Sequence, residues 1–441
     1  MGNFFISNNE IFILTLLTVT LILPFNLFNK NNRLTFAHPL IFYSLLMIYY
    51  TVLSPFLQIA SNETTSKGFD FREQYILGWT GALLSVISVF IGYSFKTKIK
   101  KRIKKYCDLD YKAIWSTGLS LNIIGIFLFM IFGGFDISLL NPFYNQSLSL
   151  DFLAYRGSLK SYLLYAQEFM VAGNFLMFSS SYSMQRKFPL TLLSLLISTS
   201  IFLNSGFRFR IFFLFTSIIL FLLIKEEKLK PKLAINLGSL AFILFLIILT
   251  FIGQIRTYGA GFNFESLSLT KDFLRTIFTQ AESSVFITTS GIINLIPKEM
   301  PFQNFYPLFK TLIHPIPGVF FDKDAGDYLF KITNAVYGFK NIYQGAAYLN
   351  FGEYYLMFGW FGIFIFNFLM GYIFKRLWLW INLHKEEPLA LMLYILNVSY
   401  IFMIISRGYL PQQVHIYLFT VFPITCIYFF NLKRKVNISL K

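Results

Sequence analysis

Apolar runs as long as a membrane is thick recur along almost the whole chain, and polar gaps separate them. A helix needs about 20 apolar residues to cross the hydrocarbon core of a bilayer. Only helices and closed barrels satisfy their own backbone hydrogen bonds in lipid, and the runs show no barrel-type alternation of apolar and polar residues. Eleven transmembrane helices are therefore predicted. They cover residues 11–28, 38–60, 75–95, 113–133, 161–184, 188–204, 211–224, 233–252, 351–374, 388–406 and 415–430.

This pattern predicts an all-α polytopic integral membrane protein in which residues 1–441 form a single transmembrane domain. The composition agrees, because 56% of the residues are hydrophobic and only 13% are charged. A soluble protein of this composition could not cover its surface with polar groups. One gap differs from the others: residues 253–350, between the eighth and ninth spans, form a long predicted loop with short helices. Within it, residues 269–294 have helical spacing of apolar positions and are predicted to lie on or dip into the membrane.

The gap "KTKIKKRIKKYCDLDYK" (96–112) sets the predicted orientation. It contains eight Lys or Arg, and such gaps stay in the cytoplasm. Alternation from this gap places the N-terminus outside, the C-terminus in the cytoplasm and the long loop 253–350 at the extracytoplasmic face. The net charge of +17 then reflects basic cytoplasmic gaps, and no nucleic-acid partner is predicted. All cytoplasmic gaps are short, so the substrate is expected at the outer face.

The stretch "LNSGFRFRIFF" (203–213) places two arginines in a short gap that this orientation puts outside. A guanidinium binds two phosphate oxygens at once, so arginines at the outer rim suit a lipid-linked diphosphate. The alternative is that each arginine reaches ordinary phospholipid phosphates. The candidate substrate-binding residues are Arg156, Arg208, Arg210, Arg256, Arg275 and Arg407.

Arg208 and Arg210 are two positions apart, so on a helix they point to opposite sides. Gly206 would permit an extended entry to the span. We expect one of the two arginines to face the protein interior, and Arg208, nearer the glycine, is the predicted one.

Two carboxylates and one histidine could take part in chemistry. Glu353 opens the ninth span, where it could act as a general base or form a structural ion pair with Arg407 or Arg256. Glu168, in the fifth span, is expected to pair within the bundle. His314, in the long loop, could be a base or a packed, hydrogen-bonded histidine.

The sequence predicts neither a metal site nor a cofactor. "DKDAGD" (322–327) could bind a divalent cation, but a solvated turn is favoured. "DLD" (108–110) lies in a cytoplasmic gap too short for a nucleotide-sugar domain. Cys107 and Cys426 form no metal-type or disulfide pattern, and no P-loop, nucleophile elbow or zinc motif occurs.

The order and sidedness of several motifs resemble the Wzy-type O-antigen polymerases and, more distantly, the O-antigen ligases. The motifs are "NSGFRFRIFFLF" at an outer span start, "HPIPGVFFDKDAGD" in the long loop, "LNFGEYYLMFGWFGIFIFNFLMGYIF" opening the ninth span, and "SRGYLP" before the last span. The resemblance implies a glycosyltransferase of the bacterial cytoplasmic membrane that uses no nucleotide sugar. It would transfer a growing glycan from undecaprenyl diphosphate onto the next lipid-linked repeat unit, at the outer face.

The resemblance also implies partners and site residues. The partners are undecaprenyl-diphosphate-linked oligosaccharides, membrane lipids and a chain-length regulator protein. Outer-loop arginines are the usual functional residues of the family, and the best-matching positions here are Arg208, Arg256 and Arg407. His314 lacks the local motif that surrounds the loop histidine of the ligases.

Three alternative functions remain at this point. A ligase-like transferase would share the donor but use another acceptor. A lipid-linked oligosaccharide flippase should show related halves and charged residues deep within its spans, and neither is visible. For a structural scaffold, the placement of the arginines would be irrelevant.

Overall fold

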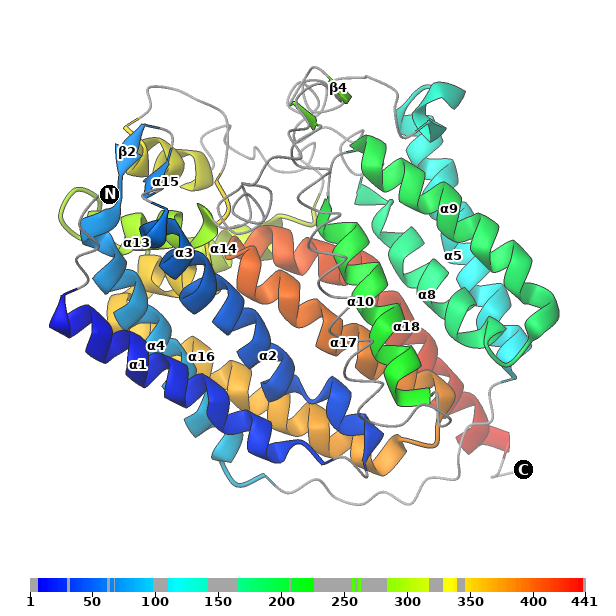
Figure 1. Ribbon diagram of the computed structural model, residues 1–441. Helices are drawn as coiled ribbons and strands as arrows, with labels where there is room; N and C mark the ends of the chain where they lie inside the picture. The colour runs from blue at the N-terminus through cyan, green and yellow to red at the C-terminus, as the bar shows by residue number, and fades with distance from the viewer. Residues whose placement is uncertain are drawn as a thin grey trace.

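The computed structural model of the protein is mostly helical, and in the part of the chain it describes the strands form two short hairpins (Figure 1). It describes residues 7–29, 32–61, 64–66, 68–97, 110–141, 163, 165–205, 208–225, 256–257, 261–262, 284–316, 328–338 and 346–438. The α-helices are α1 (Asn8–Ile22), α2 (Pro39–Met47), α3 (Ser54–Ala60), α4 (Tyr75–Ser94), α5 (Tyr111–Phe132), α8 (Glu168–Ser181), α9 (Phe188–Ser205), α10 (Arg208–Lys225), α13 (Ser284–Leu295), α14 (Tyr306–Ile313), α15 (Tyr328–Val336), α16 (Asn350–His384), α17 (Pro388–Ser406) and α18 (Leu410–Ile438). The hairpins pair β1 (Thr65–Ser66) with β2 (Phe69–Asp70) and β3 (Arg256–Thr257) with β4 (Gly261–Phe262).

Eight helical segments among the described residues are long and apolar enough to cross a membrane. They coincide, apart from their ends, with eight of the predicted spans. The segments are Asn8–Leu27, Pro39–Ala60, Arg72–Ser94, Tyr111–Phe132, Gln185–Leu203, Asn350–His384, Pro388–Ser406 and Leu410–Phe430. The predicted spans 161–184 and 211–224 are helical too, but α8 has only 14 residues and α10 carries charged residues at both ends. The prediction of a helical membrane protein is thus confirmed. Span 233–252 is not among the described residues, so the number of eleven spans and their sidedness stay predictions.

The two ends of the helix bundle differ in what they carry. Helices α13, α14 and α15 lie at one end, which we call the loop end (Figure 1, top). At the opposite end, the His38 ring contacts the rings of Tyr93 and Trp378, with centroids 5.6 Å and 4.4 Å away. These three residues flank gaps that the sequence predicts on one side of the membrane, and their contact agrees with that grouping.

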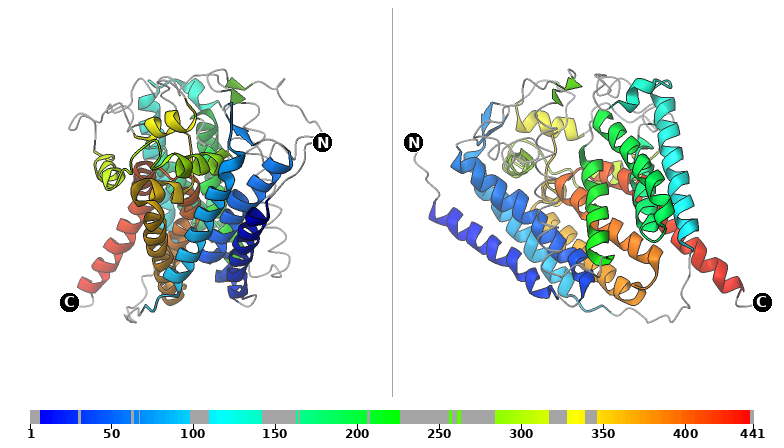
Figure 2. Two further views of the ribbon diagram at one scale, coloured as in Figure 1. Left: turned by 90° about the vertical axis from the view of Figure 1, so that its left-hand side faces the viewer. Right: turned by 45° about the vertical axis from the view of Figure 1, so that its right-hand side comes forward.

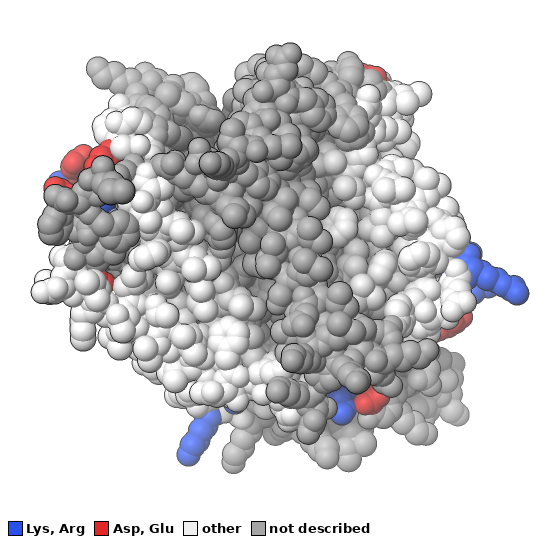
Figure 3. Space-filling view, viewed as in Figure 1, with Lys and Arg blue, Asp and Glu red and all other residues white. Residues whose placement is uncertain are grey.

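The lateral surface of the bundle is apolar. In Figure 3 most described side chains on the face shown are uncharged, and the few charged ones lie toward its edges. On α5 and α9, large side chains such as Ile123, Phe127, Leu193 and Leu196 are exposed. Exposing apolar area to water costs about 25 cal/mol per Å², whereas contact with lipid carries no such cost. This surface therefore fits a lipid environment.

The predicted span 38–60 is one helix with a widened turn. Helix α2 continues through a π-helical turn, Ile48–Leu53, into α3. Pro55 has no N–H to bond the carbonyl of Thr51, four residues earlier. The Thr51 carbonyl instead accepts the indole N–H of Trp79 at 2.8 Å. The proline therefore leaves no bare carbonyl in the membrane, and the same bond joins this span to α4.

Helices α4 and α16 approach until their backbones touch. A Cβ atom at Gly92 would lie 2.0 Å from the carbonyl oxygen of Phe368, and one at Gly371 would lie 2.0 Å from that of Val89. Helices in lipid associate through close packing of small residues, because lipid chains provide no hydrophobic driving force between them. These two glycines therefore fix the separation of α4 and α16.

Helices α5, α8 and α9 are joined by glycines and by a buried polar network. Cβ atoms at Gly118 and Gly173 would each meet the other's carbonyl oxygen, at 2.7 Å and 2.6 Å. Beside this contact, Asn122 donates to Asn174 Oδ1 at 3.1 Å, and Ser194 donates to the same oxygen at 2.8 Å. Such bonds hold helices together where water cannot compete.

Helix α16 consists of two helical parts, because it breaks at Gly359. Gly359 has φ +62° and ψ −147°, a conformation in which side chains are strained. The break frees carbonyls, and the backbone N–H groups of Gln303 and Asn304 donate to those of Leu356 and Met357 at 2.9 Å and 3.1 Å. The segment before α14 is thereby fastened to the break.

Helix α13 is the described end of the stretch 269–294, which the sequence predicts to lie on or dip into the membrane; residues 269–283 are outside the described part of the chain. Its described side chains, such as Val285, Phe286 and Ser290, are buried, and the helix packs against α4, α15 and α16. A helix covered on all sides belongs in a core. The local spacing of apolar residues does not reveal that three other helices cover it.

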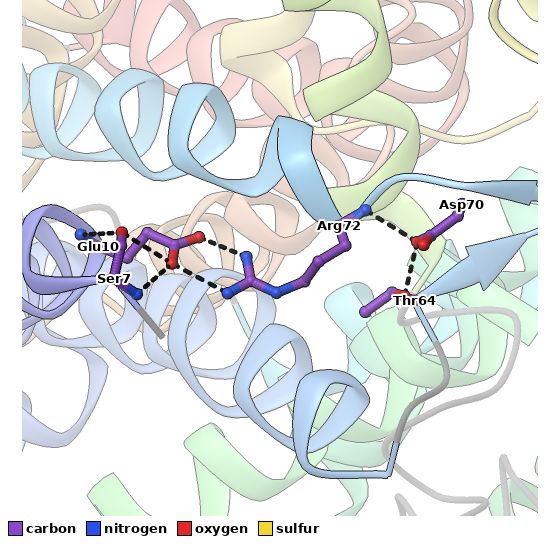
Figure 4. A network of polar contacts seen from close by, with 5 residues as sticks. All are labelled: Ser7, Glu10, Thr64, Asp70 and Arg72. Atoms are coloured by element: carbon purple, nitrogen blue, oxygen red, sulfur yellow. Dashed lines mark hydrogen bonds and ion pairs between the residues drawn. The ribbon is translucent and has the colours of Figure 1, made fainter. Parts of the chain in front are cut away.

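An ion pair fastens α1 to the turn before α4 (Figure 4). Both terminal guanidinium nitrogens of Arg72 donate to the carboxylate of Glu10, which also caps the start of α1 through Ser7. The backbone N–H of Arg72 donates to Asp70 at 3.0 Å, and Asp70 also accepts the Thr64 hydroxyl at 2.7 Å. A bidentate pair fixes orientation as well as position, so this network sets how α1 lies beside α4.

Candidate active site at the loop end

Glu353 is fully buried in the first turn of α16. The hydroxyl of Tyr328, at the start of α15, donates to Oε1, and that of Tyr348 donates to Oε2. A helix N-terminus also favours negative charge. The sequence placed Glu353 correctly at the beginning of this span, and the structure adds that two tyrosines from the long loop hold its carboxylate.

Burial, followed by the nearby Glu353 carboxylate, raises the pKa of the Tyr328 hydroxyl well above its ordinary value. Both causes act in the same direction, because a phenolate would be poorly solvated and would face a like charge. Tyr328 therefore keeps its proton at neutral pH and remains a donor to Glu353.

Arg407 lies on the turn between α17 and α18, which packs against Tyr348, a donor to Glu353. The N–H of Gly408 donates to the carbonyl of Tyr348 at 2.7 Å, and a Cβ atom at Gly408 would lie 2.6 Å from the Tyr348 ring. Only a glycine fits so close. The neighbouring Arg407 is half-buried, and its Nη1 donates to the Ser406 carbonyl at 3.3 Å.

Aromatic and imidazole rings continue from Glu353 across the loop end. Tyr328 contacts Tyr409, with ring centroids 5.2 Å apart, and Tyr409 contacts His314 at 6.3 Å. His314 contacts His415 at 5.4 Å, and His415 contacts Tyr165 at 4.0 Å. We call Tyr165, His314, Tyr328, Tyr409 and His415 the ring cluster. Segments distant in sequence therefore meet at one place.

His415 is a member of the ring cluster to which the sequence assigned no role. It is fully buried on α18, and its ring also stacks on Phe419 at 4.8 Å. His314 is half-buried at the end of α14. In the sequence, only one feature pointed to His415: it is a titratable residue at the start of an apolar span. Its contact with His314 depends on how α14 packs against α18.

Arg210 and Glu168 form a buried ion pair. Glu168 is three residues after Tyr165 of the ring cluster. Nε of Arg210 donates to Glu168 Oε1 at 2.7 Å, and Nη1 donates to Gln167 Oε1 at 2.8 Å. Both side chains of the ion pair are 1% exposed or less. The prediction that Glu168 pairs within the bundle is confirmed.

Arg210 is buried in the interior, although Arg208 is the arginine that the sequence predicts to face the interior. Helix α10 already begins at Arg208, so the stretch is helical and the extended entry expected from Gly206 does not include these two positions. The side chain of Arg208 itself is not described.

The remaining predicted residues are only partly located. Arg256 begins β3, where its backbone pairs with Phe262. Arg156, Arg275 and residues 322–327 fall in parts of the chain that the structure does not describe. Among the described residues, no group of three or more His, Cys, Asp or Glu is placed to hold a metal ion.

Comparison with known proteins identifies the family. A family model of the O-antigen polysaccharide polymerase Wzy matches residues 1–435. The chain belongs to the Wzy family. No curated protein and no solved structure matches the chain.

As a Wzy family member, the chain is a membrane polysaccharide polymerase, and its chemistry is of the glycosyltransferase type. The resemblance drawn from the motifs is confirmed over nearly the whole length. Membership of the Wzy family also favours a polymerase over the ligase, flippase and scaffold alternatives.

Proposed function

We propose that this protein transfers a growing glycan from undecaprenyl diphosphate onto the next lipid-linked oligosaccharide repeat unit, at the outer face of the bacterial cytoplasmic membrane. Wzy family membership supports the polymerase activity. The basic gap 96–112 supports the location, because it joins the ends of α4 and α5 away from the loop end and such gaps remain cytoplasmic.

The proposed step forms one glycosidic bond, breaks one bond between carbon and the diphosphate, and moves one proton. A hydroxyl oxygen of the acceptor sugar attacks the anomeric carbon of the donor glycan, and the bond between that carbon and the diphosphate oxygen breaks. The electron pair leaves with undecaprenyl diphosphate, and the hydroxyl proton passes to a base. The reaction therefore needs cations around the leaving diphosphate and a proton acceptor near the sugar hydroxyl.

In this proposal, arginines provide the positive charge around the leaving diphosphate. Arg407 is the best supported, because it is half-buried on the turn whose Gly408 bonds the backbone of Tyr348, a donor to Glu353. Arg208 and Arg256 start α10 and β3 and are proposed as further diphosphate ligands, and Arg156 and Arg275 are proposed from the sequence alone. Arg210 is assigned a different role: its guanidinium is held by Glu168 and Gln167, so it positions α8 against α10.

His314 is better placed than Glu353 to accept the proton of the sugar hydroxyl. Both carboxylate oxygens of Glu353 already accept tyrosine hydroxyls, and the side chain is fully buried. A sugar hydroxyl would have to displace one of those donors. His314 is partly exposed within the ring cluster, so we assign it as the base and Glu353 as the group that positions Tyr328 and Tyr348.

The observation that carries the proposal is that, in a Wzy family protein, Tyr328 and Tyr409 connect His314 to Glu353, while the turn that bears Arg407 packs on Tyr348. The test is an assay with purified protein reconstituted in lipid vesicles with lipid-linked repeat units and no nucleotide. We expect a ladder of products that grows by one repeat unit at a time. If products form only when a nucleotide sugar is added, the donor in the proposal is wrong.

A further inference from the structure

Helix α14 has its apolar side facing outward. Phe305, Phe309 and Leu312 are 70%, 57% and 75% exposed and lie one turn apart on one face. The buried positions of the helix are Pro307 and Thr311. A surface helix in water shows the opposite arrangement, with its apolar side against the core. The exposed side of α14 therefore fits an apolar environment.

The apolar face of α14 continues onto the membrane-crossing part of α16. Phe305 contacts Phe358 at the break in α16, with ring centroids 5.0 Å apart. Just below the break, Trp360 and Phe361 are 39% and 67% exposed. In the left view of Figure 2, the yellow-green α14 lies at the edge of the molecule, beside the ends of α16 and α18. A row of apolar side chains thus leads from a transmembrane span to α14.

The same helix ends in the candidate active site. His314 directly follows α14 and belongs to the ring cluster. Lys310, on α14, has its ammonium 5.4 Å from the Tyr306 ring centroid, and Arg407 lies on the turn that precedes α18. A molecule with an apolar chain and an anionic head could lie along α14 with its head near these cations.

We propose that the exposed face of α14, formed by Phe305, Phe309 and Leu312 and continued by Trp360 and Phe361, docks the polyprenyl chain of the lipid-linked substrate. The inference rests on the proposed function and adds a place for the substrate's lipid part. An apolar chain on this face would hold the attached diphosphate at the end of α14, one residue from His314. The substrate would then reach the site from the membrane, along α16.

The test compares two substrates with the same diphosphate-linked repeat unit, one on the native undecaprenyl chain and one on a short prenyl chain. In the variant Phe309→Ser/Leu312→Ser we expect the apparent KM for the long-chain substrate to rise about tenfold, since two large apolar contacts are lost. The KM for the short-chain substrate and kcat for both should stay within about twofold. An equal rise for both substrates, or no rise for either, would overturn the proposal; the second result would mean that α14 contacts ordinary phospholipid only.

Two controls keep the result specific. Leu193→Ser/Leu196→Ser on α9 replaces leucines of similar exposure (53% and 62%) and should leave the long-chain KM unchanged. Phe309→Leu/Leu312→Met keeps the face apolar and should behave as wild type even if the serine variant folds poorly. A raised KM in either control would count against α14 as the docking face. Inactive wild-type protein with lipid-linked repeat units would instead remove the proposed function itself.

Discussion

Two buried carboxylates, Glu168 and Glu353, occupy matching places in the molecule. Each is fully buried in the first turn of a helix, α8 or α16. Their hydrogen-bond donors differ: Arg210 holds Glu168, whereas the hydroxyls of Tyr328 and Tyr348 hold Glu353. An ion pair locks two helices together, while hydroxyl donors hold a carboxylate without adding a positive charge of their own. The first group therefore stabilises the fold, and the second is the one that we propose to serve the site.

The largest effect is expected at the ion pair. Arg210→Ala leaves the Glu168 carboxylate buried without its cation, which costs about 3–5 kcal/mol of folding stability. The double variant Arg210→Met/Glu168→Leu removes both charges and should recover most of that stability. Thermal unfolding in detergent measures both. If Arg210→Ala is stable but inactive, Arg210 belongs to the substrate site and the comparison fails.

The next effect is on transfer, near Glu353. Arg407→Ala should lower kcat by about a hundredfold, because one donor to the leaving diphosphate is lost, and His314→Gln should lower it by a similar or larger factor. Both variants should unfold within a few degrees of wild type, since both side chains are only half-buried. Surface glycan limited to one repeat unit would be the cellular result. Normal ladders in both variants would remove their proposed roles.

Glu353→Gln separates a positioning role from a base. The amide keeps an oxygen to accept a tyrosine hydroxyl, so we expect a stability loss of about 1 kcal/mol and a fall in kcat of less than about tenfold. Glu353→Ala leaves both buried hydroxyls without this acceptor and should cost about 1–3 kcal/mol for each. Loss of all transfer in a stable Glu353→Gln protein would make Glu353 the base, in place of His314.

The smallest effects should come from single donors to Glu353. Tyr348→Phe and Tyr328→Phe each remove one hydroxyl and should lower stability by about 1 kcal/mol. The Tyr328 hydroxyl fixes the position of a ring that contacts Tyr409 in the ring cluster, so Tyr328→Phe should reduce kcat more than Tyr348→Phe does. Equal kcat values would show that the ring cluster does not depend on the hydrogen bond from Tyr328 to Glu353.

Much of the fold could be predicted because membrane spans leave a strong local signal. The apolar runs identified the eight spans that the structure bears out, with errors mostly at the ends. Features that depend on neighbours were not predictable. The burial of α13 requires three covering helices, and the break at Gly359 is stabilised by backbone groups of Gln303 and Asn304.

The candidate site was predictable as a set of residue types but not as a geometry. Glu353 was predicted because a carboxylate in a span is costly without a role, and Arg407 because a guanidinium binds phosphate oxygens. His314 was predicted as a possible base in the long loop. The contact of His415 with His314 and the burial of Arg210 beside Glu168 could not be predicted, because the partners, His314 and Glu168, are distant in sequence.

The break in α16 also divides the helix into two parts with different roles. The long part after Gly359 crosses the membrane, and the short part before it carries Glu353. Because the backbone bonds at the break are made by Gln303 and Asn304, the short part is anchored to the segment that leads into α14. The long part can change its tilt in a thicker or thinner bilayer. Because of the break, the short part and the Glu353 carboxylate do not have to tilt with it as one rigid helix.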